Sequence, residues 1–235
     1  MSSRPAKSSD GLSADGLDAS LGVNLDQAES PAADSTAGVV RAYGRMAPVY
    51  DFVFGRVLEP GRERMCREIR ALNPASILEV GVGTGLALGG YPAEARIVGV
   101  DVSDRMLARA RQRAAQLPGR AISFHRVDAE HMPFADASFD CVTLPYVLSV
   151  TPRPVRLVQE VRRVCRPGGT IALLNHFSGS RFWWTLERLV KPAAEQVGFR
   201  SDFDYAEHVL AWDWEVLAVH EVNFFGLSKL VLLRN

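Results

Sequence analysis

From residue 76 onward, short apolar runs alternate with longer stretches in which apolar positions recur every three or four residues. The short runs predict buried strands, and the longer stretches predict amphipathic helices. The expected strands are SILEV (76–80), RIVGVDV (96–102), AISFHRVD (121–128), FDCVTLPYV (139–147) and GTIALLNHF (169–177). Strands that are apolar throughout and are separated by helices are typical of a parallel sheet that is buried on both faces.

The helices between these strands are expected at 61–72, before Pro74, at 103–117, with Ser103 as N-cap, and at 153–165. The end of the chain differs, because WEVLAVHEVN and LSKLVLLRN flank FFG and predict two paired antiparallel strands at the sheet edge. We therefore expect an α/β fold. It is a Rossmann-like, doubly wound, mostly parallel seven-stranded sheet with an antiparallel last strand, preceded by an N-terminal helical lid.

Composition divides the chain into a tail and one domain. Residues 1–36 are rich in Ser, Asp, Gly and Ala and lack the apolar core of a signal peptide, which predicts a disordered tail. Residues 37–235 are expected to form a single domain, in which 37–72 is the lid. The formal net charge of zero argues against a nucleic-acid partner. Three widely spaced cysteines favour a reducing, cytoplasmic location, and no cluster of His, Cys and carboxylates suggests a metal site.

The first predicted strand runs into EVGVGTG (79–85), where Gly81, Gly83 and Gly85 allow a tight turn and close approach to a ligand. Asp101 ends the second strand, where it can bind the hydroxyls of a ribose, and Asp128 ends the third strand, near an adenine amino group. Such a turn also occurs in enzymes that bind nicotinamide dinucleotides.

Two side chains separate these possibilities. A dinucleotide fingerprint requires a small residue at the position of Leu86. Glu79 directs an acid at the turn, which would repel a pyrophosphate but attract the ammonium group of an amino-acid cofactor. The residues therefore favour S-adenosylmethionine.

The motifs ILEVGVGTG, VGVDVS, VDAEHMPF, SFDCVTLPYVLSV and VCRPGGTIALLNH resemble, in order, those of class I S-adenosylmethionine-dependent methyltransferases. The resemblance spans about residues 39 to 235. It implies that the three glycines line the methionine part, that Asp101 holds the ribose, and that Leu144 offers a backbone carbonyl. The expected cofactor-binding residues are Tyr43, Glu79, Gly81, Gly83, Thr84, Gly85, Asp101, Val102, Met106, Asp128, Ala129 and Leu144.

Shorter motifs bear on the methyl acceptor. AYGRMAPVYD (42–51) resembles the ubiquinone and menaquinone methyltransferases. YDFVFGRVLEPGRE (50–63), LPYVLSVTPRP (144–154) and NHF (175–177) look more like the soluble-type bacterial phosphatidylethanolamine N-methyltransferases. The latter resemblance implies stepwise methylation of phosphatidylethanolamine toward phosphatidylcholine. A quinone C-methyltransferase, a small-molecule N- or O-methyltransferase and a non-catalytic lipid-binding module stay as alternatives.

Three residues are candidates for catalysis. His176 follows the fifth strand and is the candidate proton relay, because an ethanolamine amine is protonated at neutral pH. Tyr50 and Tyr146 are candidates for presenting a hydroxyl or a ring face to an ammonium group. An alternative for His176 is a backbone hydrogen bond at a strand end, and an alternative for Tyr146 is packing in the core.

The aromatic-basic segment, residues 39–58, combines apolar side chains with Arg41, Arg45 and Arg56. Such composition suits an anionic membrane surface, where apolar groups enter the headgroup region and arginines meet phosphates. Residues 179–192, with two tryptophans, form a possible second contact. Because no apolar run is long enough to span a bilayer, we expect a peripheral protein on the inner leaflet of the cytoplasmic membrane, although both segments could instead form only a lid.

Overall fold

The computed structural model describes residues 56–175, 214–223 and 228–235. The predicted tail, Tyr43, Tyr50, His176 and residues 179–192 lie outside the described residues, as does the aromatic-basic segment up to residue 55. The predictions made for these parts are therefore carried forward as predictions.

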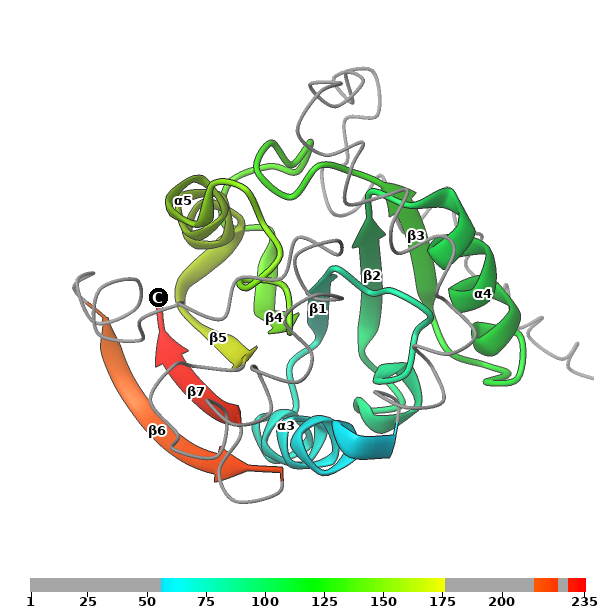
Figure 1. Ribbon diagram of the computed structural model, residues 1–235, viewed down its shortest axis with the longest axis horizontal. Coiled ribbons are helices and arrows are strands. Elements are labelled where there is room, and N and C mark those ends of the chain that lie inside the picture. Colours follow the sequence, from blue (N-terminus) through cyan, green and yellow to red (C-terminus); the bar gives the residue numbers. More distant parts are fainter. Residues whose placement is uncertain (1–55, 176–213, 224–227) are drawn as a thin grey trace, which may run out of the picture.

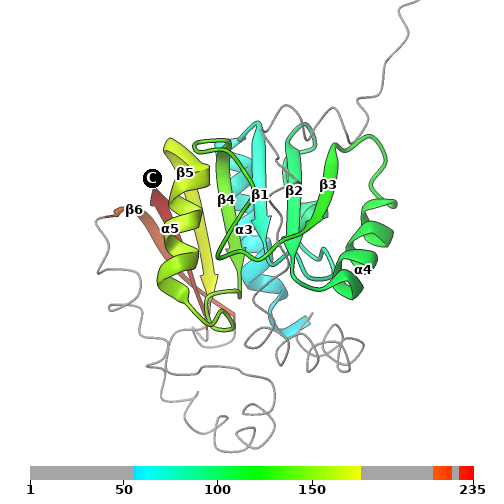
Figure 2. The same ribbon diagram turned by 90° about the horizontal axis from the view of Figure 1, so that it is seen from above.

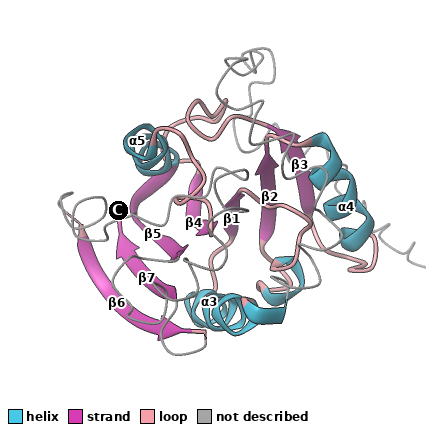
Figure 3. Ribbon diagram, viewed as in Figure 1, coloured by secondary structure: helices cyan, strands magenta, loops and turns pink. Residues whose placement is uncertain are grey.

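The described residues form helices and strands in alternating order (Figure 1 and Figure 3). The helices are α3 (Glu59–Leu72), the short 3₁₀ helix η2 (Leu88–Gly90), α4 (Asp104–Ala114) and α5 (Pro154–Val164). The strands are β1 (Ser76–Val80), β2 (Arg96–Asp101), β3 (Ile122–Arg126), β4 (Phe139–Pro145), β5 (Cys165–Asn175), β6 (Glu215–Val222) and β7 (Ser228–Arg234).

All seven strands form one sheet in the order β3-β2-β1-β4-β5-β7-β6. Strands β1 to β5 pair in parallel, whereas β7 is antiparallel to both β5 and β6. The strand order reverses between β1 and β4, which is the position where an open α/β sheet binds its ligand. The predicted Rossmann-like sheet with an antiparallel last strand is confirmed, and of the two paired strands at its edge β6 is the outer one.

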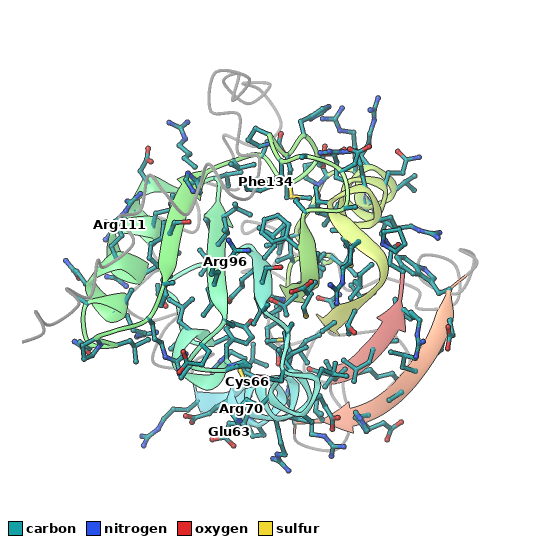
Figure 4. All side chains as sticks on the ribbon, turned by 180° about the vertical axis from the view of Figure 1, so that it is seen from behind. Glu63, Cys66, Arg70, Arg96, Arg111 and Phe134 are labelled. Atoms are coloured by element: carbon teal, nitrogen blue, oxygen red, sulfur yellow. The ribbon has the colours of Figure 1, made fainter. Side chains whose placement is uncertain are left out.

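Helices cover both faces of the sheet, with α5 on one side and α3 on the other (Figure 1). On the first face, the apolar side of α5 belongs to one buried cluster with residues of β1, β2, β4, β5 and β7. On the second face, Met65, Cys66 and Ile69 of α3 join Leu107 of α4 in a separate cluster. Cys66 points toward the sheet while Glu63 lies on the outer side of α3 (Figure 4). All three cysteines are buried and unpaired, as expected for residues that fill the core.

Local chemistry explains where the helices begin and end. Ser103 caps α4, because its hydroxyl accepts a hydrogen bond from the backbone N–H of Met106 (3.4 Å). Asn73 ends α3 in the left-handed conformation, with φ of 46°. Helix α4 stops at Ala114, three residues before the predicted end, and β5 starts at Cys165, four residues before the predicted start, since it follows α5 directly. Within the described residues, no helix has the length and apolar character needed to cross a membrane.

Candidate functional site

The turn after β1 lies at the switch point of the sheet. Gly81, Gly83 and Gly85 have φ angles of 66°, 54° and 79°, which side chains with a β-carbon rarely adopt. A β-carbon at Gly81 would overlap the side chain of Val147, and one at Gly85 would lie 2.6 Å from Leu88. At Gly83 the nearest atom would be 3.9 Å away, so this backbone borders open space that a ligand can approach.

Asp101 lies beside this turn at the end of β2. Its Oδ2 accepts a hydrogen bond from the backbone N–H of Gly83 (3.0 Å), and its Oδ1 accepts one from Ser103 (2.9 Å). The carboxylate therefore ties the glycine turn to the start of α4. Burial raises the pKa of Asp101, although hydrogen bonds from the backbone N–H groups of Ser103, Gly83 and Val102 act in the opposite direction. A carboxylate has about four lone pairs, so capacity is left to accept from a ribose hydroxyl.

Glu79, the second-last residue of β1, is 1% exposed. Its Oε2 has no hydrogen-bond partner among the described residues. Burial raises the pKa of Glu79 to about 8, while a hydrogen bond from Tyr91 and the charge of Arg62 act in the opposite direction. A buried acid with an unpartnered oxygen, next to an open glycine turn, suits the cationic part of a ligand.

The adenine side of the predicted site is built from the ends of β2 and β3. The backbone N–H of Val127 donates to the carbonyl of Asp101 (3.2 Å), which brings the residue before Asp128 next to the end of β2. Asp128 accepts a hydrogen bond from the backbone N–H of Glu130 (3.0 Å). Val102 and Ala129 are partly buried, whereas Met106 of α4 is 7% exposed. These positions agree with an adenine pocket at the carboxyl edge.

The end of β4 carries two predicted site residues. Leu144 is 1% exposed and pairs with Leu173 of β5. Tyr146 has a φ of 64°, and its hydroxyl donates to the carbonyl of Leu58 (3.3 Å) and accepts from the amide of Asn223 (3.1 Å). The predicted contact between its ring face and an ammonium group stays a prediction. Its hydroxyl, however, is engaged by the start of α3 and the end of β6.

The structure thus brings the predicted residues of the described part to one edge of the sheet. Sequence reasoning missed Tyr91, which links Glu79 to the hydroxyl of Thr143 (3.0 Å). It also missed Glu130, which is 4% exposed and accepts hydrogen bonds from Thr151 and Arg153. A glutamate inside the mostly apolar motif VDAEHMPF was the available signal for Glu130, since a buried charge requires partners.

Comparison with known proteins identifies the class. The sequence matches the family described as "Methyltransferase domain" over residues 78–173. A phosphatidylethanolamine N-methyltransferase from Cereibacter sphaeroides is 38% identical over 167 residues, which cover 70% of this chain and 81% of the relative. The chain belongs to the class I S-adenosylmethionine-dependent methyltransferases, and S-adenosylmethionine is its cofactor.

Two further proteins are similar to this chain, one in sequence and one in fold. A 2-phytyl-1,4-naphtoquinone methyltransferase from Trichormus variabilis is 33% identical over 180 residues, covering 69% of this chain and 78% of the relative. The solved structure of a SAM-dependent methyltransferase from Thermotoga maritima matches with a TM-score of 0.60 at 20% identity, covering 83% of this chain and 99% of that one. The structural match shows the fold alone.

The residues present fit this cofactor. The unpartnered Oε2 of Glu79 provides a site for the ammonium group of the methionine part. The open space at Gly83 allows backbone contact, and Asp101 stands beside it for the ribose. The predicted class and cofactor are thereby confirmed.

Proposed function

We propose that the protein transfers methyl groups from S-adenosylmethionine to the headgroup amine of phosphatidylethanolamine and its mono- and dimethyl derivatives, toward phosphatidylcholine. The observation that carries this proposal is the 38% identity to a phosphatidylethanolamine N-methyltransferase along 81% of that protein. The motifs LPYVLSVTPRP and NHF, which look like this family, lie at and after the ends of β4 and β5, where an acceptor has to meet the cofactor.

S-adenosylmethionine, when bound, supplies an electrophilic methyl group on a sulfonium. Glu79 and the glycine turn hold its methionine part, while Asp101 and Asp128 hold the ribose and the adenine. The protein has to align the amine with the methyl group and to exclude water, since in-line displacement depends on orientation. Val80 of β1 and Leu144 of β4, which are buried near the ends of their strands, support this proposal because they help to exclude water.

The amine must lose a proton before it attacks, because its ordinary pKa is about 10, like that of a lysine side chain. We assign the acceptance of this proton to His176. It directly follows Asn175, a fully buried residue whose Oδ1 accepts a hydrogen bond from the hydroxyl of Ser149 (3.2 Å). Asn175, the last residue of β5, thus lies beside the loop after β4. Desolvation lowers the pKa of the amine and assists the step.

Methylation makes the product ammonium larger and its charge more diffuse. Aromatic faces bind such groups by cation–π interaction, which is the role that we assign to the ring of Tyr50 and, from the end of β4, to the ring of Tyr146. Neither role requires the phenol hydroxyl.

A lipid acceptor requires access to the membrane surface. We assign this contact to the aromatic-basic segment, with residues 179–192 as a second contact. Of the last residues of the segment, which the structure describes, Arg56 is exposed and Val57 is 41% exposed, whereas Leu58 is 5% exposed and belongs to the core instead of the membrane contact. The protein would then act peripherally on the anionic inner leaflet of the cytoplasmic membrane.

The test is an acceptor assay. Purified protein is incubated with methyl-labelled S-adenosylmethionine and vesicles of phosphatidylethanolamine plus an anionic lipid, and the lipids are resolved by mass. We expect mono-, di- and trimethylated headgroups. Cofactor binding without any labelled lipid would refute the phospholipid assignment.

A second candidate is methylation of a quinone precursor at carbon, favoured by the 33% identity to the naphtoquinone methyltransferase. The same assay separates the two functions when demethylated quinones replace the phospholipid. Label in the quinone and none in the lipid would support this candidate, for which the amine-deprotonating role of His176 has no purpose.

A further inference from the structure

Gly61 occupies an unusual position, the first turn of α3 within the motif LEPGRE. Glycine is one of the poorest helix formers, so a helix gains nothing from it locally. The reason lies elsewhere in the fold, because a β-carbon at this position would lie 2.6 Å from the hydroxyl oxygen of Tyr146. Gly61 is therefore required by the close approach of Tyr146, 85 positions further along the chain (146 − 61).

The start of α3 also depends on a distant cap. Leu58 is the N-cap residue and provides no side-chain hydrogen bond. Instead, the Oδ1 of Asn223 accepts from the backbone N–H of Gly61 (2.9 Å), one of the donors that a helix leaves unpaired at its start. The amide group of Asn223 donates to Tyr146 (3.1 Å) and to the hydroxyl of Ser228 (2.8 Å). One side chain thus joins α3, β4 and β7.

Both central residues of this group adopt a backbone conformation that is rare outside glycine. Asn223 has a φ of 65° and Tyr146 a φ of 64°. Asparagine tolerates this region, but a large aromatic residue rarely occupies it without a functional reason. The conformation is supported on both sides: the backbone N–H of Tyr146 donates to Leu174 (2.6 Å), and its hydroxyl donates to Leu58 (3.3 Å).

The hydrogen-bonded group of Tyr146, Asn223 and the first turn of α3 connects the aromatic-basic segment with the cofactor turn. The start of α3 and the carboxyl ends of the parallel strands share one edge of the sheet (Figure 2). The aromatic-basic segment ends at residue 58, inside the group. On the other side, Val147 directly follows Tyr146 and lies against Gly81 of the cofactor turn.

We propose that Tyr146 and Asn223 are positioning residues that anchor the first turn of α3, and with it the end of the aromatic-basic segment, to the loop that borders the cofactor turn. This inference rests on the proposed function in one respect: the anchored segment is the one assigned to the membrane contact. Methyl transfer to an acceptor in a vesicle then requires the anchor, whereas cofactor binding does not.

Two variants remove the anchor with little disturbance of the backbone. Tyr146→Phe removes only the hydroxyl, and Asn223→Gly removes the amide while keeping the left-handed conformation accessible. Asn73→Gly is the matched control, because Asn73 ends the same helix with a φ of 46° and is exposed. The thermal transition of each variant shows that the fold is retained.

The first measurement is hydrogen exchange in the full-length protein, read from peptides that cover residues 58–65. Loss of a buried hydrogen bond is expected to accelerate exchange of the first turn of α3 at least about fivefold in Tyr146→Phe and Asn223→Gly. Asn73→Gly is expected to exchange there like the unmodified protein. Unchanged exchange in the two anchor variants would overturn the proposal, whatever the acceptor is.

The second measurement is kinetic. In each anchor variant kcat/KM for phosphatidylethanolamine vesicles is expected to fall about tenfold, with the Kd of S-adenosylmethionine within about twofold. The double variant is expected to lose less than the sum of the two single losses, because both variants remove the hydrogen bond between Asn223 and Tyr146. The proposed link would be overturned by any of three results: losses of kcat/KM that add in the double variant, unchanged kinetics, or a loss of cofactor affinity as large as the loss of kcat/KM. If the unmodified protein does not methylate the lipid, the proposed function fails, and the exchange result still decides the anchor.

Discussion

Glu79 is a buried acid, 1% exposed, whose Oε2 has no hydrogen-bond partner among the described residues. The groups that surround it are the hydroxyl of Tyr91, the thiol of Cys66 and, further away, the charge of Arg62. Burial also raises the pKa of Cys66, to about 12, so the thiol stays neutral beside the acid. The stability of the cofactor-free protein therefore depends on the protonation of Glu79.

The stability of the cofactor-free protein is expected to decrease with pH through this one residue. Between the ordinary pKa of 4.5 and the raised value of about 8, the folded protein holds a proton that the unfolded chain releases. Its free energy of unfolding then falls by up to about 1.4 kcal/mol per pH unit. Glu79→Gln cannot release this proton, so the variant is expected to gain stability relative to the unmodified protein from pH 5 to pH 8.

Urea unfolding at several pH values measures this difference. Glu94→Gln is a suitable control, because Glu94 is exposed in the loop before β2. Curves of stability against pH that run parallel for Glu79→Gln and the unmodified protein would contradict the assignment.

The sequence could predict those site residues that belong to a local pattern, but not the interactions between residues that lie far apart in the chain. Gly81, Gly83 and Asp101 were predictable because a strand, a turn and an acid at fixed spacing form a local pattern. The hydrogen bonds of Tyr146 were not predictable, since its partners Leu58 and Asn223 lie 88 and 77 positions away. Its positive φ is likewise set by the packed structure and leaves no local signal.

The loop after β3 and the start of α5 are held together by Glu130. Its carboxylate accepts hydrogen bonds from the hydroxyl of Thr151 (2.9 Å), and from the backbone N–H (2.8 Å) and guanidinium (2.5 Å) of Arg153. The side chain of Arg153 is half exposed, whereas that of Glu130 is 4% exposed. Most of the stabilisation therefore comes from the buried hydrogen bonds and less from the ion pair.

We expect Glu130→Ala to lower the free energy of unfolding by about 2–3 kcal/mol, because buried donors lose their acceptor. Asp136→Ala provides the comparison. Asp136 pairs with Arg163 at 2.8 Å, but its side chain is 79% exposed, so its loss is expected to cost less than about 1 kcal/mol. Chemical denaturation of both variants tests the difference, and equal losses would show that Glu130 is not a buried link.

The type and order of the described α-helices and strands were predicted from the sequence, whereas the 3₁₀ helix η2 was not, and several element boundaries were predicted less well. Apolar runs identified the strands, and Ser103 identified the start of α4. The early start of β5 at Cys165 could not be predicted, because the sequence RPGG at 166–169 is typical of a turn. The insertion of β7 between β5 and β6 was missed, since apolar periodicity does not encode which strands pair.

The described end of the aromatic-basic segment precedes α3, whose start lies at the same edge of the sheet as the carboxyl ends of the parallel strands (Figure 2), so an approach to a membrane through this segment would be directional. Arg41, Arg45 and Arg56 of the aromatic-basic segment are expected to bind anionic vesicles. Replacing all three by alanine is expected to weaken binding by about 3 kcal/mol, at about 1 kcal/mol for each basic residue. Sedimentation with neutral and anionic vesicles measures this, and binding is expected to weaken as salt shortens the Debye length.

The control replaces an equal number of exposed arginines toward the opposite edge: Arg70, Arg111 and Arg166. If the control weakens binding as much, net charge rather than the aromatic-basic segment determines the contact. Equal sedimentation with neutral and anionic vesicles would refute its electrostatic part.

The position of β7 has a consequence for the way in which the protein is made. Within the described residues, β6 pairs only with β7, so β5 cannot gain its second neighbour before residues 228–234 have been synthesised. The intervening stretch, 176–227, takes the ribosome roughly 3–10 s at about 5–20 residues per second. During that interval the edge of β5 that later pairs with β7 presents backbone N–H and C=O groups without this partner strand. For several seconds the nascent chain can therefore bind chaperones, or aggregate, along this strand.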